Sequence, residues 1–322
     1  MKKATLIQTL LVVGLLSGCA TKSSDRFREG DNTGQNVDLS VEDEKKLTKE
    51  ALSEMQKEFP PVKNPQLQAY IDRIGQKIVK DNGLDNKPYT YKFTVVDSPM
   101  INAFALPAGA VFMTTAIIAA AESEAEIAGV LGHEIGHVVA RHTAERMYVA
   151  KQEQGKTWLF GGVGAVLGGA AGYVLGSKLC KEGDTACKAK MAVYGVGGGA
   201  AGGLLVQRYG FMKNSQEDEL ESDRVGFRYA VKSGYDKKYV GDFYEKLLAL
   251  EQEAKRNQNA LMGAITDAMS SHPPSQERVT QAKEMEQKIS IEGGKVSSPE
   301  FPSMKKIAQQ LVNQSKQKQA AK

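Results

Sequence analysis

Apolar residues recur at helical spacing in several segments of the chain. Residues 66–80 place five of them on one face, namely Leu67, Tyr70, Ile71, Ile74 and Ile78, and Asn82-Gly83 ends the segment. A charged amphipathic helix is expected over residues 40–59, with Ser40 as its N-cap. Further helices are expected over residues 217–233 and 247–264, and the Ser-His-Pro-Pro run at 271–274 interrupts the pattern.

Two segments show strand patterns instead. Tyr89, Tyr91, Phe93 and Val95 alternate with other residues, which predicts a half-buried strand. Residues 102–115 carry two apolar arms around Pro-Ala-Gly at 107–109, which predicts a strand, a tight turn and a strand. We therefore expect an α+β fold that is mainly helical, with a small sheet.

A capping box formed by Ser123 and Glu126 opens a long helix that we expect to continue to about residue 154. It contains the sequence His-Glu-Ile-Gly-His at 133–137. Positions i and i+4 share one helix face, so His133 and His137 can bind one metal ion. Glu134 lies beside them, where it can take a proton from a water molecule at the metal.

The N-terminus has the pattern of an export signal. Lys2 and Lys3 precede an apolar run too short to span a membrane, and residues 16–19 (Leu-Ser-Gly-Cys) resemble a bacterial lipobox. We expect residues 1–18 to be a lipoprotein signal peptide and Cys19 to be lipidated. Alanine at position 20 favours the outer membrane, facing the periplasm. Residues 19–40 are polar and read as a flexible tether.

Composition adds little to these assignments. The formal net charge of +4 falls by two when the signal and its lysines are removed, so nucleic acid is not expected as a partner. We expect one metallopeptidase-like domain over residues 41–295 and a basic tail over 296–322. The tail has five lysines and no acidic residues from 301 onward, and a solvated, frayed helix is expected there.

The segment 157–207 is unusual because glycines repeat every four residues in two uncharged arms. Such spacing allows close helix approach, so we expect an inserted helical hairpin that enters a membrane, self-associates into a homo-oligomer, or packs on the body. Cys180 and Cys187 lie between the arms. An exported protein meets an oxidising compartment, so we expect a disulfide between them.

A catalytic zinc site needs a third protein ligand. His142 follows His133 by nine residues, which does not fit the ten-residue spacing of the metzincins. The acidic segment at 217–223 offers Glu217, Glu219 and Glu221 as glutamate ligands, and periodicity alone does not separate Glu217 from Glu219.

Together, these motifs resemble the HtpX-like and CAAX-prenyl-endopeptidase-like zinc metallopeptidases (metallopeptidase family forty-eight), especially small periplasmic lipoprotein members. The resemblance spans about residues 45–285 and implies a zincin-like (gluzincin) fold with one Zn²⁺ per chain. That family has a Glu-x-x-Ala-Asp motif, which residues 219–223 match with serine at 222. By this resemblance Glu219 is the third ligand, and Asp223 orients a zinc-binding histidine.

Two other segments resemble the family. Residues 102–109 look like its edge strand, which can take a substrate backbone as an added strand. Residues 271–278 look like its late His-Pro segment, which ends in arginine. The resemblance implies that His272 gates the zinc or helps to stabilise the transition state together with Arg278, although a purely structural role is equally open.

The leading hypothesis is a zinc endopeptidase of the bacterial envelope that degrades misfolded or unassembled proteins. A second is a chaperone-like assembly lipoprotein that binds clients while His272 plugs the zinc. A third makes the glycine-rich hairpin the main functional element. The intact Glu134 favours the first, because a structural zinc site needs no general base.

Overall fold

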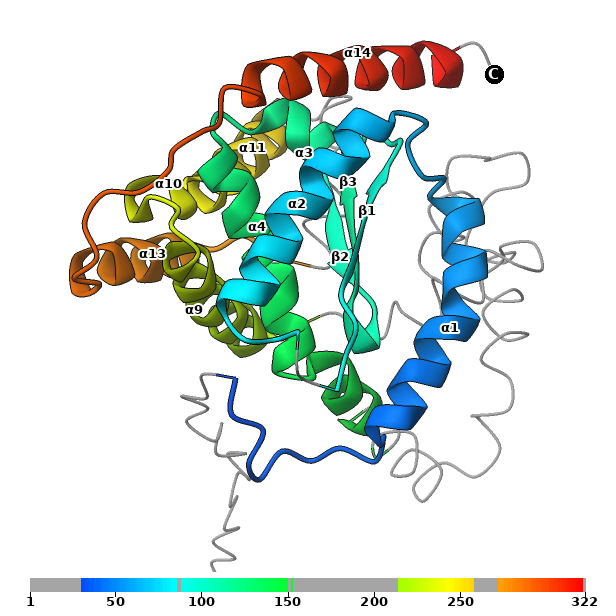
Figure 1. Ribbon diagram of the computed structural model, residues 1–322, viewed down its shortest axis with the longest axis vertical. Coiled ribbons are helices and arrows are strands. Elements are labelled where there is room, and N and C mark those ends of the chain that lie inside the picture. Colours follow the sequence, from blue (N-terminus) through cyan, green and yellow to red (C-terminus); the bar gives the residue numbers. More distant parts are fainter. Residues whose placement is uncertain (1–29, 86–87, 150–151, 153–213, 258–271, 321–322) are drawn as a thin grey trace, which may run out of the picture.

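The computed structural model describes residues 30–85, 88–149, 152, 214–257 and 272–320. The elements in these ranges are, in chain order, α1 (Val41–Glu58), α2 (Pro65–Asp81), β1 (Lys92–Val96), β2 (Ala103–Ala105), the 3-10 turn η1 (Pro107–Gly109), β3 (Ala110–Thr114), α3 (Thr115–Ala120), α4 (Glu124–Val139), α9 (Gln216–Lys232), α10 (Lys237–Val240), α11 (Asp242–Asn257), α13 (Gln276–Lys288) and α14 (Phe301–Ala320). The fold is mostly helical with a small sheet, as expected (Figure 1).

The sheet has the order β1-β3-β2, with β1 parallel and β2 antiparallel to β3. β2 is therefore an edge strand, as predicted for residues 102–109. The turn before β3 is tight, since Ala108 and Gly109 both have positive φ. A side chain at Gly109 would lie 2.9 Å from the carbonyl oxygen of Thr90, so the backbone passes close to the segment before β1.

Helices cover both faces of the sheet, with α1 on the side opposite to α2 and α4 (Figure 1). Alternate residues of β3 serve the two sides: Val111 and Met113 face the larger core, and Phe112 faces α1. The strand predicted over residues 89–95 is present in part, and its alternating residues Tyr89, Tyr91, Phe93 and Val95 are all buried, but it is not half-buried. β1 begins at Lys92, and all four residues after it are buried.

Helices α4 and α9 cross at glycine. A Cβ atom added to Gly132 would lie 2.5 Å from the carbonyl oxygen of Gly226, and one added to Gly136 would lie 2.9 Å from that of Ser222. Small residues on both helices thus let the two backbones approach each other directly. This contact fixes the position of α9 relative to the histidines of α4.

The predicted single helix from 123 to about 154 is interrupted. α4 begins at the predicted N-cap, where the Ser123 side chain accepts a hydrogen bond from the Glu126 N–H, but it ends at Val139. Arg141 then adopts a left-handed backbone with φ of 54°, and a new helical segment begins at His142. The guanidinium of Arg141 bonds the carbonyl oxygen of Leu39 and pairs with Glu44, which holds this break in place.

The start of the domain also differs from prediction. Residues 30–35, expected to belong to a flexible tether, are docked beside the end of α4. The Asn32 amide donates to the Val139 carbonyl at 2.9 Å, and the Gln35 amide donates to the Ala140 carbonyl at 2.7 Å. These bonds satisfy carbonyl groups that the ending helix leaves without intrahelical partners.

The C-terminal tail is not the solvated helix that its composition suggests. α14 packs against α3 and α2, and it buries Phe301, Ala308 and Val312 (Figure 1). Lys306, Lys316 and Lys318 are exposed, while this apolar stripe joins the main core. The boundary expected at residue 296 therefore does not separate a free tail from the body.

Several expectations fall outside the described residues. These are the signal peptide, Cys19, the hairpin 157–207 with Cys180 and Cys187, and the end of the helix expected at 247–264, which begins earlier, at Asp242. Within the described part of the chain, no helix combines the length and apolar character needed to cross a membrane.

Candidate active site

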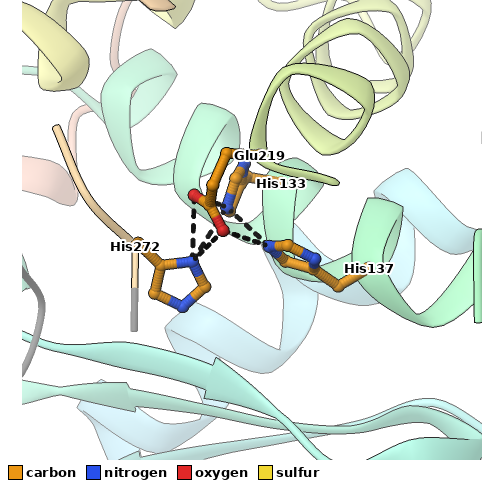
Figure 2. Close-up of side chains that lie close together, drawn as sticks. All are labelled: His133, His137, Glu219 and His272. Atoms are coloured by element: carbon orange, nitrogen blue, oxygen red, sulfur yellow. Dashed lines mark hydrogen bonds and ion pairs between the residues drawn. The ribbon is translucent and has the colours of Figure 1, made fainter. Parts of the chain in front are cut away.

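Two histidines on α4 form the base of the site. His133 and His137 lie one helical turn apart, and both are buried. Their Nε2 atoms are 2.9 Å from each other and point to the same side of the helix (Figure 2). The spacing read from the sequence thus produces two convergent imidazole nitrogens.

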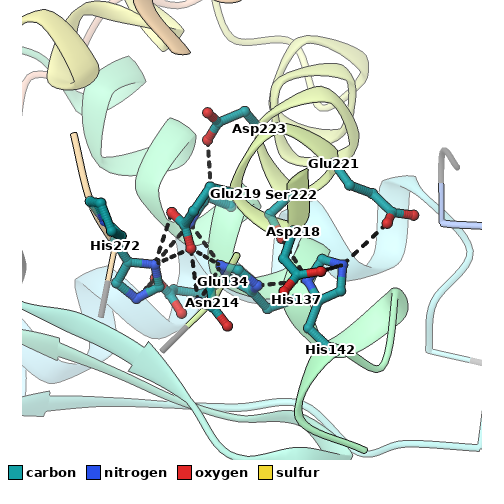
Figure 3. A network of polar contacts seen from close by, with 12 residues as sticks. Glu134, His137, His142, Asn214, Asp218, Glu219, Glu221, Ser222, Asp223 and His272 are labelled. Carbon is teal, nitrogen blue, oxygen red and sulfur yellow. Dashed lines mark hydrogen bonds and ion pairs between the residues drawn. The ribbon is translucent and has the colours of Figure 1, made fainter. Parts of the chain in front are cut away.

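The third donor comes from α9. A capping box between Ser215 and Asp218 starts this helix, and Glu219 follows in its first turn. The Glu219 carboxylate lies 3.4 Å from His133 Nε2 and 3.3 Å from His137 Nε2. Glu217 is exposed, and Glu221 turns away from the two ligands (Figure 3).

His272 reaches the same point from the segment before α13. Its Nδ1 atom lies 3.2 Å from His133 Nε2 and 3.1 Å from Glu219 Oε1. One ligand atom from each of His133, His137, Glu219 and His272 falls within 4.8 Å of all the others. Among the described residues, this is a four-donor group that brings together three segments far apart in the sequence.

A second layer holds these donors in place. Asp223 Oδ1 lies 2.7 Å from His133 Nδ1, one turn after Glu219 on the same helix. Arg278 on α13 donates to both Asp223 oxygens at 2.7 Å and forms an ion pair with Glu219 Oε2 at 2.9 Å. The Arg278 guanidinium is only 2% exposed and stacks on the Tyr244 ring. In these contacts Arg278 holds two carboxylates of the site, and its predicted part in transition-state stabilisation stays a prediction.

Glu134 lies beside the donors without joining them. Its Oε1 is 3.6 Å from His272 Nε2, and its Oε2 is buried with no hydrogen-bond partner in the described ranges. Burial raises the pKa of Glu134. A carboxylate that is close to the metal donors, raised in basicity and left with one free oxygen suits a general base that receives a proton from water.

The charges of the site favour a divalent cation. Glu134, Glu219 and Asp223 are buried with Arg278 as the guanidinium among them, so full ionisation leaves a deficit of two positive charges. Burial lowers the pKa of His133, but Glu219 and Asp223 outweigh this effect and raise it to about 9. Burial and His133 together hold the pKa of His137 well below its ordinary value. A protonated His133 therefore supplies one of the two missing charges at neutral pH, and a bound cation would take the place of that proton, while His137 stays neutral.

The donor set also fits zinc chemically. Histidine nitrogens and a carboxylate oxygen bind Zn²⁺ at roughly 2.0–2.2 Å, which places tetrahedral ligand atoms about 3.3 Å apart. The nitrogen–oxygen separations of 3.3 and 3.4 Å match this value, and the histidine pair at 2.9 Å is slightly closer. Three such ligands leave one position, which His272 borders.

Two residues near the donors make contacts that the sequence-based prediction did not assign to them. The Asn214 amide donates to Glu219 Oε1 at 2.8 Å, from the residue before the N-cap of α9. His142, rejected above as a metal ligand, contacts His137 on the face away from the donors. No spacing rule identifies either one, because both depend on how the chain turns outside the regular helices.

A small pocket adjoins Glu134. It is bordered by His133, His272 and Arg278 and lined by apolar side chains from the edge strand and the residue pair before it, and from α3, α4 and α11. These are Ile101, Ala103, Ile117, Val130, Phe243 and Leu247. An apolar side chain is the group that such a lining accommodates.

Comparisons with known proteins agree with this geometry. The chain matches the family model described as Peptidase family M48 over residues 65–286. It is 28% identical over 284 residues to the beta-barrel assembly-enhancing protease of Yersinia pestis, and 26% identical over 285 residues to that of Escherichia coli (strain K12). Each alignment covers 87% of this chain and 52% of the relative, so the chain spans about half the length of these relatives.

The chain is also similar to a eukaryotic protein. The mitochondrial metalloendopeptidase OMA1 of Arabidopsis thaliana is 30% identical over 205 residues, which covers 63% of this chain and 33% of that protein. The family match contains the four donors, Glu134, Asp223 and Arg278. Helices α1 and α14 lie outside it.

Proposed function

Since this chain belongs to peptidase family M48, we propose that it is a zinc-dependent endopeptidase of zincin-like fold whose single ion is held by His133, His137 and Glu219. The observation that carries this proposal is the buried convergence of these three side chains beside Glu134. The charge deficit of the site, together with the free oxygen of Glu134, supports catalytic rather than structural metal binding.

Bound zinc would acidify a water molecule and polarise the peptide carbonyl. Glu134 accepts the proton of the attacking water and delivers it to the departing amine. Asp223 accepts from His133 Nδ1, which keeps the Nε2 lone pair directed at the donor cluster. Arg278 neutralises Asp223 and Glu219, so that neither carboxylate has to take up a proton.

The substrate backbone would pair with β2, the edge strand beside α4. Main-chain pairing selects an extended, unfolded segment and imposes little sequence preference. The adjoining pocket would then receive an apolar side chain close to the scissile bond, since Glu134 borders it. Misfolded or unassembled proteins expose such segments, so they are the substrate class that we propose.

His272 is proposed as a gate. Its contacts with His133 and Glu219 place a fourth nitrogen where the open zinc position is expected. The chaperone-like alternative rests on the same contact, because a permanently plugged site would bind clients without cutting them. The gated protease and the chaperone-like protein differ in the expected effect of removing the His272 ring on the rate of cleavage.

The cell envelope is the proposed location. The lipobox-like residues 16–19 support a lipid anchor at Cys19 in the outer membrane, and the bacterial relatives bear the name beta-barrel assembly-enhancing protease. The hairpin 157–207 remains a proposed membrane or self-association element, and the disulfide between Cys180 and Cys187 likewise remains a proposal.

The test is cleavage of an unfolded protein by the purified, zinc-loaded chain beside Glu134→Gln. Glutamine preserves the size of the side chain and cannot act as a base, so kcat/KM should fall by about 10²–10⁴-fold while zinc content stays equal. Equal cleavage by both proteins would contradict the proposal and indicate a contaminating protease.

The gate is tested by His272→Ala in the same assay. A gated protease should cleave faster after the ring is removed, at unchanged zinc stoichiometry. Slower cleavage would instead assign His272 to transition-state stabilisation. A variant and a wild type that both bind zinc and unfolded clients without cleaving them would support the chaperone-like alternative.

A further inference from the structure

His142 lies against the metal-ligand candidate His137 without being a donor itself. It is 1% exposed, and its Nδ1 atom is 2.8 Å from His137 Nδ1. Its other nitrogen, Nε2, is 3.2 Å from Glu221 Oε2 (Figure 3). A line of contacts therefore leads from the Glu221 carboxylate through one imidazole to a second imidazole at the donor cluster.

We propose that His142 is a positioning residue that holds His137 in its metal-binding tautomer, with Glu221 as the terminal acceptor. This inference rests on the proposed function for the identity of the metal site. An ionised carboxylate can only accept, so His142 Nε2–H donates to Glu221 and His142 Nδ1 carries a lone pair. That lone pair accepts from His137 Nδ1–H, which leaves the lone pair of His137 on Nε2, facing Glu219 and His133.

The two ligand histidines are thus oriented by different means. His133 Nδ1 meets the carboxylate of Asp223 directly at 2.7 Å, whereas His137 Nδ1 is linked to a carboxylate through His142. Both arrangements fix the same tautomer and raise the basicity of Nε2. Glu221, one of the three glutamates that periodicity offered as ligands, acquires a function one layer further out.

The break after α4 makes this contact possible. In an uninterrupted helix, residue 142 would lie about 140° around the axis from residue 137, out of reach of its ring. The left-handed backbone of Arg141 turns the chain so that the helix restarting at His142 folds back beside His137. The interruption of the helix is therefore required for the relay.

The N-terminal segment 30–35 braces both ends of the relay. The backbone N–H of Gly30 donates to Glu221 Oε1 at 3.1 Å, which leaves Oε2 for His142. Asn32 and Gln35 bond the carbonyl groups of Val139 and Ala140 at the break. Residues 30–35 thus support the orientation of a proposed metal-ligand side chain.

The first test reads the tautomers directly. Long-range ¹H–¹⁵N correlation spectra of the metal-free full chain, labelled at histidine, should show His137 protonated on Nδ1 and His142 on Nε2. A His137 protonated on Nε2 would overturn the proposal. Because this measurement needs neither zinc nor activity, it decides the inference even if the chain proves not to bind zinc and the proposed function fails.

The second test compares zinc affinity, measured by chelator competition, in His142→Leu and His142→Gln. Leucine removes both hydrogen bonds, and zinc affinity should fall about 10–100-fold. Glutamine can still accept at one end and donate at the other, and should restore much of the affinity. Equal affinity in the wild type and His142→Leu would overturn the proposal.

A destabilised control separates positioning from general loss of structure. Ile78→Val removes one buried methyl group on α2, away from the relay, and should leave zinc affinity and the His137 tautomer unchanged. If His142→Leu does not fold, Glu221→Leu interrupts the same relay at its far end. It should then lower zinc affinity, and an unchanged affinity there would also contradict the inference.

Discussion

The three buried carboxyl groups around the histidines differ in proton affinity because each faces different neighbours. Burial raises the pKa of Glu219, but His272 and Arg278 outweigh it and hold that pKa well below its ordinary value. Burial acts in the same way on Asp223, whose pKa Arg278 lowers. Only Glu134 keeps a raised pKa. The metal-side carboxylates thus stay ionised, while the proposed base remains able to hold a proton.

Asp242, at the start of α11, gives a pH-dependent prediction at the residue scale. Burial, followed by Glu126 and Glu245, raises its pKa to about 6 from 3.8. The folded state therefore favours protonated Asp242, and this stability is lost as the pH rises through about 6. Asp242→Asn should raise the melting temperature at pH 7–8 and leave it unchanged below pH 4. After discounting for solvent exposure, we expect about 1 kcal/mol, or roughly 2–4 °C.

Asp43 provides a control of opposite sign. Hydrogen bonds from Ser40 lower its pKa, so ionised Asp43 stabilises the fold above pH 4 and this contribution disappears as the pH falls. Asp43→Asn should therefore lower the melting temperature at neutral pH. If Asp242→Asn and Asp43→Asn shifted the melting temperature in the same direction at neutral pH, the substitutions would not be acting through the charges of these two carboxylates.

At this scale the sequence identifies the donors on one helix but not their partners on another. The i, i+4 spacing is enough to place His133 and His137 together. It does not separate Glu217 from Glu219, because the face of α9 that meets α4 depends on Gly132 and Gly226 rather than on apolar periodicity. Only the family motif singled out Glu219, and no local pattern indicated His142.

At the scale of elements, the contact between α4 and α9 determines the width of the metal site. α4 contributes two donors one turn apart, α9 contributes Glu219 with Asp223 one turn later, and glycine at the crossing sets how closely the two helices approach. A Cβ atom at Gly226 would collide with the backbone nitrogen of His133 and with Gly132. Any side chain there must push Glu219 and Asp223 away from the histidines.

Gly226→Ala should therefore weaken both the fold and the site. We expect a loss of about 1–3 kcal/mol in the free energy of unfolding, as for overpacked cores, and a clear loss of zinc affinity. Denaturant unfolding and chelator competition measure the two effects. Gly75→Ala is the matched control: its Cβ atom would meet the Phe93 ring away from the site, so it should cost stability and leave zinc affinity unchanged. Wild-type zinc binding in Gly226→Ala would show that the crossing distance does not control the site.

The interruption of α4 shows why element boundaries were harder to predict than the elements themselves. Ala140 and Arg141 are good helix formers, and the apolar pattern runs through them. The break is held by tertiary contacts: the Asn32 and Gln35 amides donate to carbonyl groups of this turn, and Arg141 donates to the Leu39 carbonyl. The local sequence around residue 140 therefore does not predict the end of α4, because the residues that hold the break lie about a hundred positions earlier in the chain.

At the scale of the whole molecule, both ends of the described chain take part in the core. The C-terminal helix α14 covers α3, and Ser315 donates to Asp97 at 2.7 Å near the end of β1. Glu124, buried at the start of α4, binds Lys295 and Ser298 and so fixes the segment that leads to α14. Composition suggested a free basic tail because the lysines outnumber the few apolar residues that are buried.

Removal of residues 301–322 should therefore destabilise the protein. Burial of a Phe or Val side chain contributes about 1.5–3 kcal/mol each, so the loss should reach several kcal/mol, with increased binding of a hydrophobic dye. Thermal unfolding measures the first effect. Lys305→Gln with Lys306→Gln is the control, and should change stability by less than about 0.5 kcal/mol. An unchanged melting temperature after truncation would mean that α14 is only loosely attached.

The docking of residues 30–35 shortens the linker between Cys19 and the folded domain, and so limits how far the domain can lie from the membrane. Eleven residue steps separate Cys19 from Gly30, and an extended chain covers at most about 40 Å over that length. A tether that remained undocked up to Val41 would extend to about 75 Å. With Cys19 anchored in lipid as proposed, the active site can therefore act only on substrates that lie close to the bilayer. Polypeptides that fold farther away would escape it, and those delayed at the membrane surface would not.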